Sequence, residues 1–213
     1  SVFGVKDAYL NSDADFHTTV SKMADIPRDQ AKTINLGLFY GMGKAKLQAE
    51  LGVSKDKAEE LFAIYHQRVP FVKTLMKSVS NRAQQRGQIR TLLGRLCRFH
   101  LWEPNRFGIN KALPFEQAVQ EHGQGNIRRA YTYKALNKLI QGSAADMTKK
   151  SMLDLYKEGI IAHIQIHDEL DLSVESPEQA KKVVEIMENA VKLDVPNKVD
   201  YESGKNWGDI YDK

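Results

Sequence analysis

The sequence contains little cysteine and no long apolar run, and each absence excludes a class of structure. Its one cysteine, Cys97, rules out an intramolecular disulfide and a zinc site built from several cysteines. A single thiol fits a reducing cytoplasm. No apolar stretch approaches the roughly 20 residues that a membrane-spanning helix needs, and no signal-peptide pattern opens the chain. We therefore expect a cytoplasmic protein without a membrane partner.

The composition is that of an ordinary globular protein with a mild excess of positive charge. Hydrophobic residues make up 42% of the 213 residues, which is enough for one large or two modest domains with real cores. The net charge is +4 and the sequence pI is about 9.0. This charge balance is compatible with a nucleic-acid partner but is also common among proteins that have none. Whether the chain binds nucleic acid therefore has to be inferred from its motifs.

A strong helix signal begins at Pro27. Proline is favoured in the first turn of a helix, and Asp25 and Asp29 are placed to interact with the positive N-terminal end. The segment Gly41-Met42-Gly43 is typical of a helix C-terminus. The pattern predicts a helix from Pro27 to about Tyr40.

Two cations share one face of this predicted helix. Arg28 and Lys32 are four residues apart, and four residues advance about 400° around a helix, so the side chains stack. Stacked cations repel mildly unless an anion lies over both. A triphosphate would be such an anion, and the alternative is a solvated basic stripe. Gly37 favours a ligand or another backbone in close approach, because glycine inside a helix costs about 1 kcal/mol relative to alanine.

Residues 44–87 carry helix-packing patterns without obvious chemistry. Gly52 predicts the end of one helix, Ser54 the N-cap of the next, and Pro70 a break before a third. Their apolar faces predict burial against one another. Residues 88–99 predict a small hairpin around Gly94-Arg95.

The following segments differ sharply in helix signal. Residues 100–125 contain several prolines and glycines and predict a long loop with at most a short helix around 115–119. From Asn126 to about Lys157 the pattern predicts one long helix or a bent pair, with Gly142 as the weak point.

Polar residues on this second long segment form two groups. Asn137 and Gln141 are four residues apart and therefore share one helix face. The alternative to a binding role for this pair is that both lie on the solvated side. Arg128, Arg129 and Lys134 supply positive charge for phosphates.

The stretch Ile160 to Val174 predicts a β-hairpin with His167-Asp168-Glu169 at its bend. Its first half is rich in β-branched isoleucine, and its second half alternates apolar with polar residues. Carboxylates on a rigid turn suit a hard divalent cation such as Mg²⁺, and the alternative is a solvated acidic turn. Next, Ser176-Pro177-Glu178-Gln179 predicts a capped helix behind the hairpin, and residues 198–201 predict an edge strand.

Three of these segments occur in the order found in the family A (polymerase I-like) DNA polymerases. Residues 28–41 resemble that family's fingers helix, residues 137–146 its palm helix, and residues 166–170 its palm hairpin. Further similar segments are Asp15-Phe16-His17, Thr91 to Arg95, and Ser203 to Gly208. The chain thus resembles the C-terminal part of such a polymerase, of bacterial or bacteriophage type.

The resemblance implies a nucleotide-binding role for the early helix. In the family a basic pair holds the triphosphate, which implies that Arg28, Lys32 and His17 hold phosphates here. Tyr40 would lie by the templating base. Leu36 stands where the family usually has Phe or Tyr near the sugar, so sugar discrimination is expected to differ.

The resemblance also implies the catalytic and DNA contacts. Asp168 would bind catalytic Mg²⁺, Glu169 would support the metal site, and His167 would position the primer end; with Lys32 these are the catalytic candidates. The amides on the long helix would touch the minor groove, where every base pair offers acceptors. The implied DNA-binding residues are Arg95, Arg128, Arg129, Lys134, Asn137, Gln141 and His167.

The predicted fold is α+β and mainly helical, with a fingers module over 1–125 and a partial palm over 126–213 that packs an antiparallel hairpin on helices. The implied activity is template-directed DNA synthesis from dNTP on a primer-template, by two-Mg²⁺ nucleotidyl transfer. The family's other metal aspartate lies in an Asp-Tyr-Ser-like motif that this chain lacks, so an N-terminal polymerase fragment is the expected partner. The alternatives are a non-catalytic DNA- or nucleotide-binding fragment and a structural remnant. The expected location is the cytoplasm of a bacterial or virus-infected bacterial cell.

Overall fold

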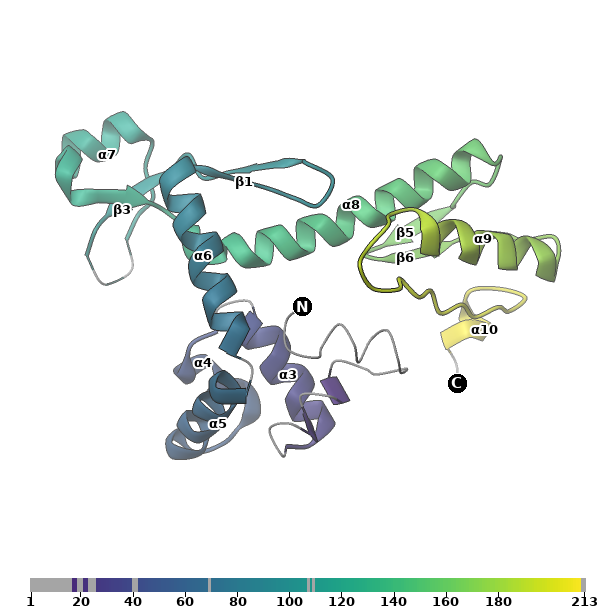
Figure 1. The fold of residues 1–213 in the computed structure, drawn as a ribbon, viewed down its shortest axis with the longest axis horizontal. Helices are drawn as coiled ribbons and strands as arrows, with labels where there is room; N and C mark the ends of the chain where they lie inside the picture. The colour runs from purple at the N-terminus through teal and green to yellow at the C-terminus, as the bar shows by residue number, and fades with distance from the viewer. Residues whose placement is uncertain are drawn as a thin grey trace. The chain divides into compact units, whose positions relative to one another are not determined.

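The computed structural model describes residues 17–18, 21–22, 26–39, 42–68, 70–106, 108 and 110–211. Contacts divide this part of the chain into two compact units, one up to Ser143 and one from Ala144 onward. The elements confirm a mainly helical α+β fold with small antiparallel sheets (Figure 1). The division after residue 143 differs from the predicted module boundary after residue 125, because compact units need not coincide with functional modules. The fingers and palm assignment stays a prediction.

Local signals set the ends of the helices in the first unit. Gly52 adopts a left-handed conformation with φ of 63° after α4, and the Ser54 hydroxyl accepts a hydrogen bond from the Lys57 N–H (3.2 Å) at the start of α5. Pro70 is the first residue of α6, as expected for a residue that lacks an N–H. The helices are α3 (Arg28–Phe39), α4 (Lys44–Leu51), α5 (Lys55–Arg68) and α6 (Pro70–Arg86).

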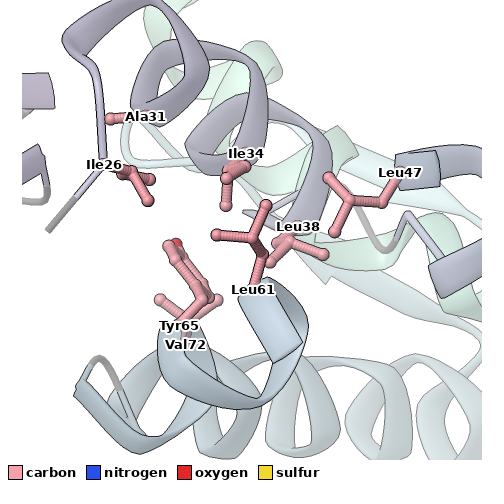
Figure 2. Close-up of a cluster of buried hydrophobic side chains, with 8 residues drawn as sticks. All are labelled: Ile26, Ala31, Ile34, Leu38, Leu47, Leu61, Tyr65 and Val72. Atoms are coloured by element: carbon pink, nitrogen blue, oxygen red, sulfur yellow. The ribbon is translucent and has the colours of Figure 1, made fainter. Parts of the chain in front are cut away.

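These helices enclose an apolar core (Figure 2). One stripe of α3 faces inward, and the buried residues of α4, α5 and α6 meet it, as the helical periodicity predicts. The core residues are Ile26, Ala31, Ile34, Leu38, Leu47, Leu61, Tyr65 and Val72. The predicted close approach at Gly37 has a protein cause, since a Cβ there would collide with the side chain of Met42.

The second half of this unit contains two small sheets. The predicted hairpin is confirmed as β1 (Gln88–Arg90) paired with β2 (Leu96–Arg98). A second antiparallel pair joins β3 (Trp102–Pro104) to β4 (Ile127–Arg129), with Trp102 opposite Arg129. The connecting segment contains α7 (Phe115–His122) and the 3₁₀ turn Gln124–Asn126, and α7 packs beside β3.

Two predictions about these segments are wrong in part. The predicted loop over 100–125 contains a strand, although its short helix is confirmed and extends to His122. The predicted helix from Asn126 begins only at Ala135, because residues 127–129 pair with a strand about 25 residues earlier in the sequence. Helical periodicity does not detect such a distant partner. After the 3₁₀ turn Thr132–Lys134, α8 (Ala135–Lys157) runs unbroken through Gly142.

The second unit packs a hairpin and a helix on the end of α8. Strands β5 (Ile164–Ile166) and β6 (Glu169–Asp171) are antiparallel, and α9 (Pro177–Asn189) follows (Figure 1). The Ser176 hydroxyl accepts from the Gln179 N–H (3.2 Å), which confirms the predicted cap. Leu155, Ile160 and Val183 form the core. Residues 198–201 form no strand, so that prediction is wrong. The last described helix is α10 (Gly208–Tyr211).

Within the described ranges, no helix combines the length and the apolar character that crossing a bilayer requires.

Candidate active site

The outward face of α3 carries the predicted phosphate-binding cations. Arg28, Lys32 and Leu36 are exposed, while the opposite side of the helix is buried in the core. Leu36 keeps 43% of its surface exposed although it is apolar. Tyr40, the predicted template contact, lies outside the described residues. The basic stripe therefore faces solvent and has room for an anion.

A segment before α3 lies beside this stripe. The Asn35 amide nitrogen lies 3.2 Å from the His17 Nδ1, and the Arg28 Nε donates to the Thr18 hydroxyl (3.3 Å). These contacts hold the segment that contains His17, a predicted phosphate ligand, against the helix that carries Arg28. Sequence reasoning missed Asn35. The available signal was a polar residue among the buried positions of α3.

The predicted acidic bend is confirmed as a tight two-residue turn. Ile166 pairs with Glu169, which leaves His167 and Asp168 as the turn residues. His167 has a positive φ of 53°, and its carbonyl accepts from the Gln165 side-chain amide (2.7 Å). The Asp168 side chain is exposed on this turn. The backbone thus holds one carboxylate outward on a short, fixed connection.

The two faces of this hairpin are chemically different. Leu170 and Leu172 pack on the core of the second unit. Glu169 and Asp171 lie on the opposite face, because side chains alternate along a strand. Burial, with a contribution from the neighbouring Glu169, raises the pKa of Asp171, and the Asp171 Oδ2 atom is buried.

The donor set suits a partial magnesium site. Among the described residues, no group of three His, Cys, Asp or Glu side chains is arranged to hold a metal ion. Mg²⁺ is nonetheless often bound by one or two carboxylates, with water and substrate phosphates completing its shell. Asp168 is a hard oxygen donor of that kind. The hairpin therefore fits a site in which Asp168 supplies part of the Mg²⁺ coordination shell and other groups supply the rest.

The loop of the β1–β2 hairpin packs on α8 beside the predicted DNA face. Arg95 donates to the Gly142 carbonyl (2.8 Å), and the Leu92 N–H donates to the Ser143 hydroxyl (2.9 Å). A Cβ at Gly142 would lie 2.9 Å from the Thr91 methyl. The loop therefore explains the glycine within this helix. Asn137 is partly buried on α8, and Gln141 is exposed one turn later.

Two predicted DNA-binding arginines have protein partners. Arg128 forms an ion pair with Glu103 across the β3–β4 pair (2.9 Å). The Arg129 guanidinium donates to the Phe99 and Gln84 carbonyls (2.9 and 3.2 Å) and lies 4.5 Å from the centre of the Trp102 ring. Lys134, in contrast, is exposed. Phosphate contacts by Arg128 and Arg129 stay predictions and would compete with these partners.

The remaining sequence prediction places Asp168 and Lys32 at one cleft. Lys32 belongs to the first unit and Asp168 to the second. Their shared site stays a prediction.

Comparisons with known proteins all match the chain to DNA polymerases. A profile described as DNA polymerase family A matches residues 6–209. The chain is 33% identical over 98% of its length to a DNA-directed DNA polymerase of Pseudomonas phage M6, and 35% identical over 91% of its length to DNA polymerase I of Bacillus caldotenax. It spans 33% and 21% of those two proteins.

A solved structure resembles the chain as well. It is described as the POL domain of Pol1 from M. smegmatis in complex with DNA primer-template and dNTP. The similarity has a TM-score of 0.69 at 28% sequence identity, and it covers 91% of this chain and 34% of the other.

Proposed function

Because the chain belongs to DNA polymerase family A, we propose that it is the part of a template-directed DNA polymerase that binds dNTP and contributes to nucleotidyl transfer onto a primer 3′-hydroxyl. The observation that carries the proposal is the arrangement on α3. Arg28 lies beside the segment that contains His17, and Lys32 is exposed one turn after Arg28. Three groups that favour phosphate thus gather on one side of one helix.

These side chains would act mainly through charge and position. A triphosphate carries several negative charges, and a basic helix face neutralises them while keeping the α-phosphate in place. The His17 ring, held by Asn35, would add a hydrogen-bond donor. Leu36 would contact the sugar and Tyr40 the templating base, so this one helix would supply contacts to each part of the nucleotide.

The hairpin turn would supply the metal chemistry. Asp168 would hold Mg²⁺, with Glu169 supporting the site and His167 positioning the primer end. When bound, a pair of Mg²⁺ ions activates the primer hydroxyl and neutralises the phosphates. A second carboxylate would come from a polymerase segment outside the described residues, on an N-terminal partner.

The long helix would position the duplex. Asn137 and Gln141 would donate to minor-groove acceptors, which are present in every base pair. Such contacts tolerate any sequence, as copying requires. The cations proposed to contact the DNA backbone are Arg95, Arg128, Arg129 and Lys134.

A second candidate function is DNA or nucleotide binding without catalysis. The assignment of the basic α3 face and of Asp168 to different compact units favours it, because phosphate binding by that face need not use the hairpin. In that case the α3 face would still bind triphosphate, but Asp168 would be dispensable.

Primer extension distinguishes the two candidates. The chain is mixed with an N-terminal palm-and-thumb segment of the phage relative's polymerase, and extension is measured with Mg²⁺. We expect Asp168→Ala to reduce extension by at least about 100-fold, while the exposed control Asp200→Ala leaves it unchanged. Extension that survives Asp168→Ala would reject the catalytic role, and robust extension by the chain alone would remove the need for a partner.

A further inference from the structure

We propose that Tyr131 and Tyr133, with the Lys134 ammonium close to both rings, form a stacking site for unpaired bases of single-stranded DNA. Both rings are solvent-accessible, with Tyr131 41% and Tyr133 58% exposed. The Lys134 ammonium lies 5.3 Å from the centre of the first ring and 5.6 Å from the second. Aromatic faces beside a cation are the usual elements of single-strand binding surfaces, because every base has a face that stacks.

The backbone at Tyr131 supports a role for its side chain. Its φ of 62° and ψ of 12° lie in the left-handed region, which bulky residues rarely adopt and which glycine or asparagine enters easily. A tyrosine at such a position is not explained by the turn itself. Strained conformations of this kind concentrate at functional sites.

The flanking residues hold this conformation. Ala130 is buried, and its N–H donates to the Leu101 carbonyl (2.9 Å). With its amide oriented to satisfy the neighbouring groups, the Gln84 side chain bridges both sides of the turn: it donates to the Arg129 carbonyl (3.2 Å) and the Thr132 hydroxyl (3.3 Å) and accepts from the Arg129 N–H (2.8 Å). With Ala130 and Thr132 fixed, the Tyr131 ring is kept at the surface.

The charge around the rings favours a phosphate chain. Residues 122–145 contain four Lys or Arg and no Asp or Glu. On the strand opposite this segment, Glu103 is paired with Arg128. Lys134 and Lys138 are exposed, so cations flank the rings without a competing carboxylate in the same segment.

Ring stacking selects single strands over duplex. In a duplex the base faces are covered by neighbouring bases, whereas an unpaired base offers a face to a side chain. The identity of the ligand as DNA rests on the proposed function. The site uses ring faces, whereas the amides on α8 would contact the edges of paired bases.

Binding of a fluorescent oligothymidine to the 213-residue chain, measured by anisotropy at low salt, tests the site. We expect Tyr131→Gly and Tyr133→Ala each to weaken binding by about 5- to 100-fold, the range for losing one stacked base. Tyr131→Phe and Tyr133→Phe should retain it. Because glycine relieves the backbone conformation, Tyr131→Gly should not lower the thermal midpoint. The matched control is Tyr156→Ala, at a tyrosine on α8 that is 66% exposed. This variant should bind the oligothymidine with the affinity of the wild-type chain.

Three outcomes of the binding measurements would reject the proposed stacking site. It is rejected if wild-type chain does not bind the oligothymidine, if the Tyr131→Gly, Tyr133→Ala double variant binds equally well, or if blunt duplex binding falls in parallel. Photocrosslinking with 5-iodouracil should mark Tyr131 or Tyr133, and crosslinks only elsewhere would contradict the proposal. Oligothymidine binding is measured without primer extension, so failure of this site is distinguished from failure of the catalytic proposal, which Asp168→Ala tests by extension.

Discussion

Asn35 shows how one buried polar residue can serve a surface site. It is 1% exposed, and its amide nitrogen contacts the His17 Nδ1. Its amide oxygen has no hydrogen-bond partner among the described residues. A buried oxygen without a partner costs about 1–3 kcal/mol. When the amide donates to Nδ1, the ring proton of the His17 imidazole lies on Nε2, and in that tautomer Asn35 also holds the orientation of the ring.

Replacing Asn35 should affect the stability of the fold and the affinity for dNTP in different ways. We expect Asn35→Leu to leave the free energy of unfolding unchanged or to raise it by up to about 1 kcal/mol, because leucine has similar size and no unsatisfied oxygen. Binding of a non-hydrolysable dNTP should weaken about tenfold, roughly the 1.4 kcal/mol expected for a lost charge-assisted hydrogen bond. Urea unfolding and calorimetric titration measure the two effects.

The control is a double-variant comparison. If Asn35 acts through His17, the binding losses of Asn35→Leu and His17→Ala should not add in the double variant. Additive losses would show that Asn35 contributes in another way.

At the scale of elements, the contact between the β1–β2 loop and α8 explains why glycine occupies position 142, in the middle of a long helix. Thr91 is buried, and the loop is fixed to α8 by hydrogen bonds from Arg95 and Leu92. The glycine gives the loop room that a methyl group would occupy. This contact also lies next to Gln141, so the loop supports the helix face proposed to contact DNA.

This contact reverses the usual effect of alanine in a helix. Gly→Ala inside a helix normally stabilises by about 1 kcal/mol. At Gly142 the new Cβ would lie 2.9 Å from the Thr91 Cγ2 and 3.2 Å from the Arg95 Nη2, so we expect Gly142→Ala to destabilise by about 1–3 kcal/mol. Thermal unfolding measures the change.

A second substitution tests the cause. Thr91→Ser removes the colliding methyl group and should restore most of the stability of Gly142→Ala. Gly125→Ala, where a Cβ would meet nothing within 4 Å, should be close to neutral. If the Gly142→Ala, Thr91→Ser double variant is as unstable as Gly142→Ala alone, the collision with the Thr91 methyl group is not the cause of the destabilisation.

The elements that the sequence predicted well are those set by local chemistry. Gly52, Ser54, Pro70 and Ser176 mark helix ends through their own backbone or hydroxyl, and all four do so in the structure. The hairpin around Asp168 was predictable for the same reason, because β-branched and alternating residues specify strands locally.

The features that the sequence missed depend on distant partners. Residues 127–129 form a strand only because Trp102–Pro104 pairs with them. The contact of Asn35 with His17 joins residues 18 positions apart, and Arg129 is held by Gln84, Phe99 and Trp102. Periodicity within a window contains no information about such pairs.

At the scale of the whole molecule, the chain consists of two compact units. Each has its own apolar core, its own capped helix and one of the two tryptophans: Trp102 in the first and Trp207 in the second. Each unit can therefore be followed through its own tryptophan once the other tryptophan is replaced.

We expect the units to unfold in separable transitions. Ser54→Ala should lower the stability of the first unit and Ser176→Ala that of the second, each by about 1 kcal/mol, the usual cost of losing a helix N-cap. Urea unfolding with Trp207→Phe reports the first unit through Trp102, and Trp102→Phe reports the second through Trp207. If both cap variants shift both signals equally, the chain unfolds as one cooperative unit.

The short strands bear on how the protein behaves at high concentration. Every strand that the structure describes spans three residues and belongs to a two-stranded sheet. Fibril growth and edge-to-edge association use longer strand edges as templates, typically six or seven residues with many unpaired backbone groups. Edges of this length offer few such groups, so self-association of the folded chain would depend on its exposed side chains rather than on added strands.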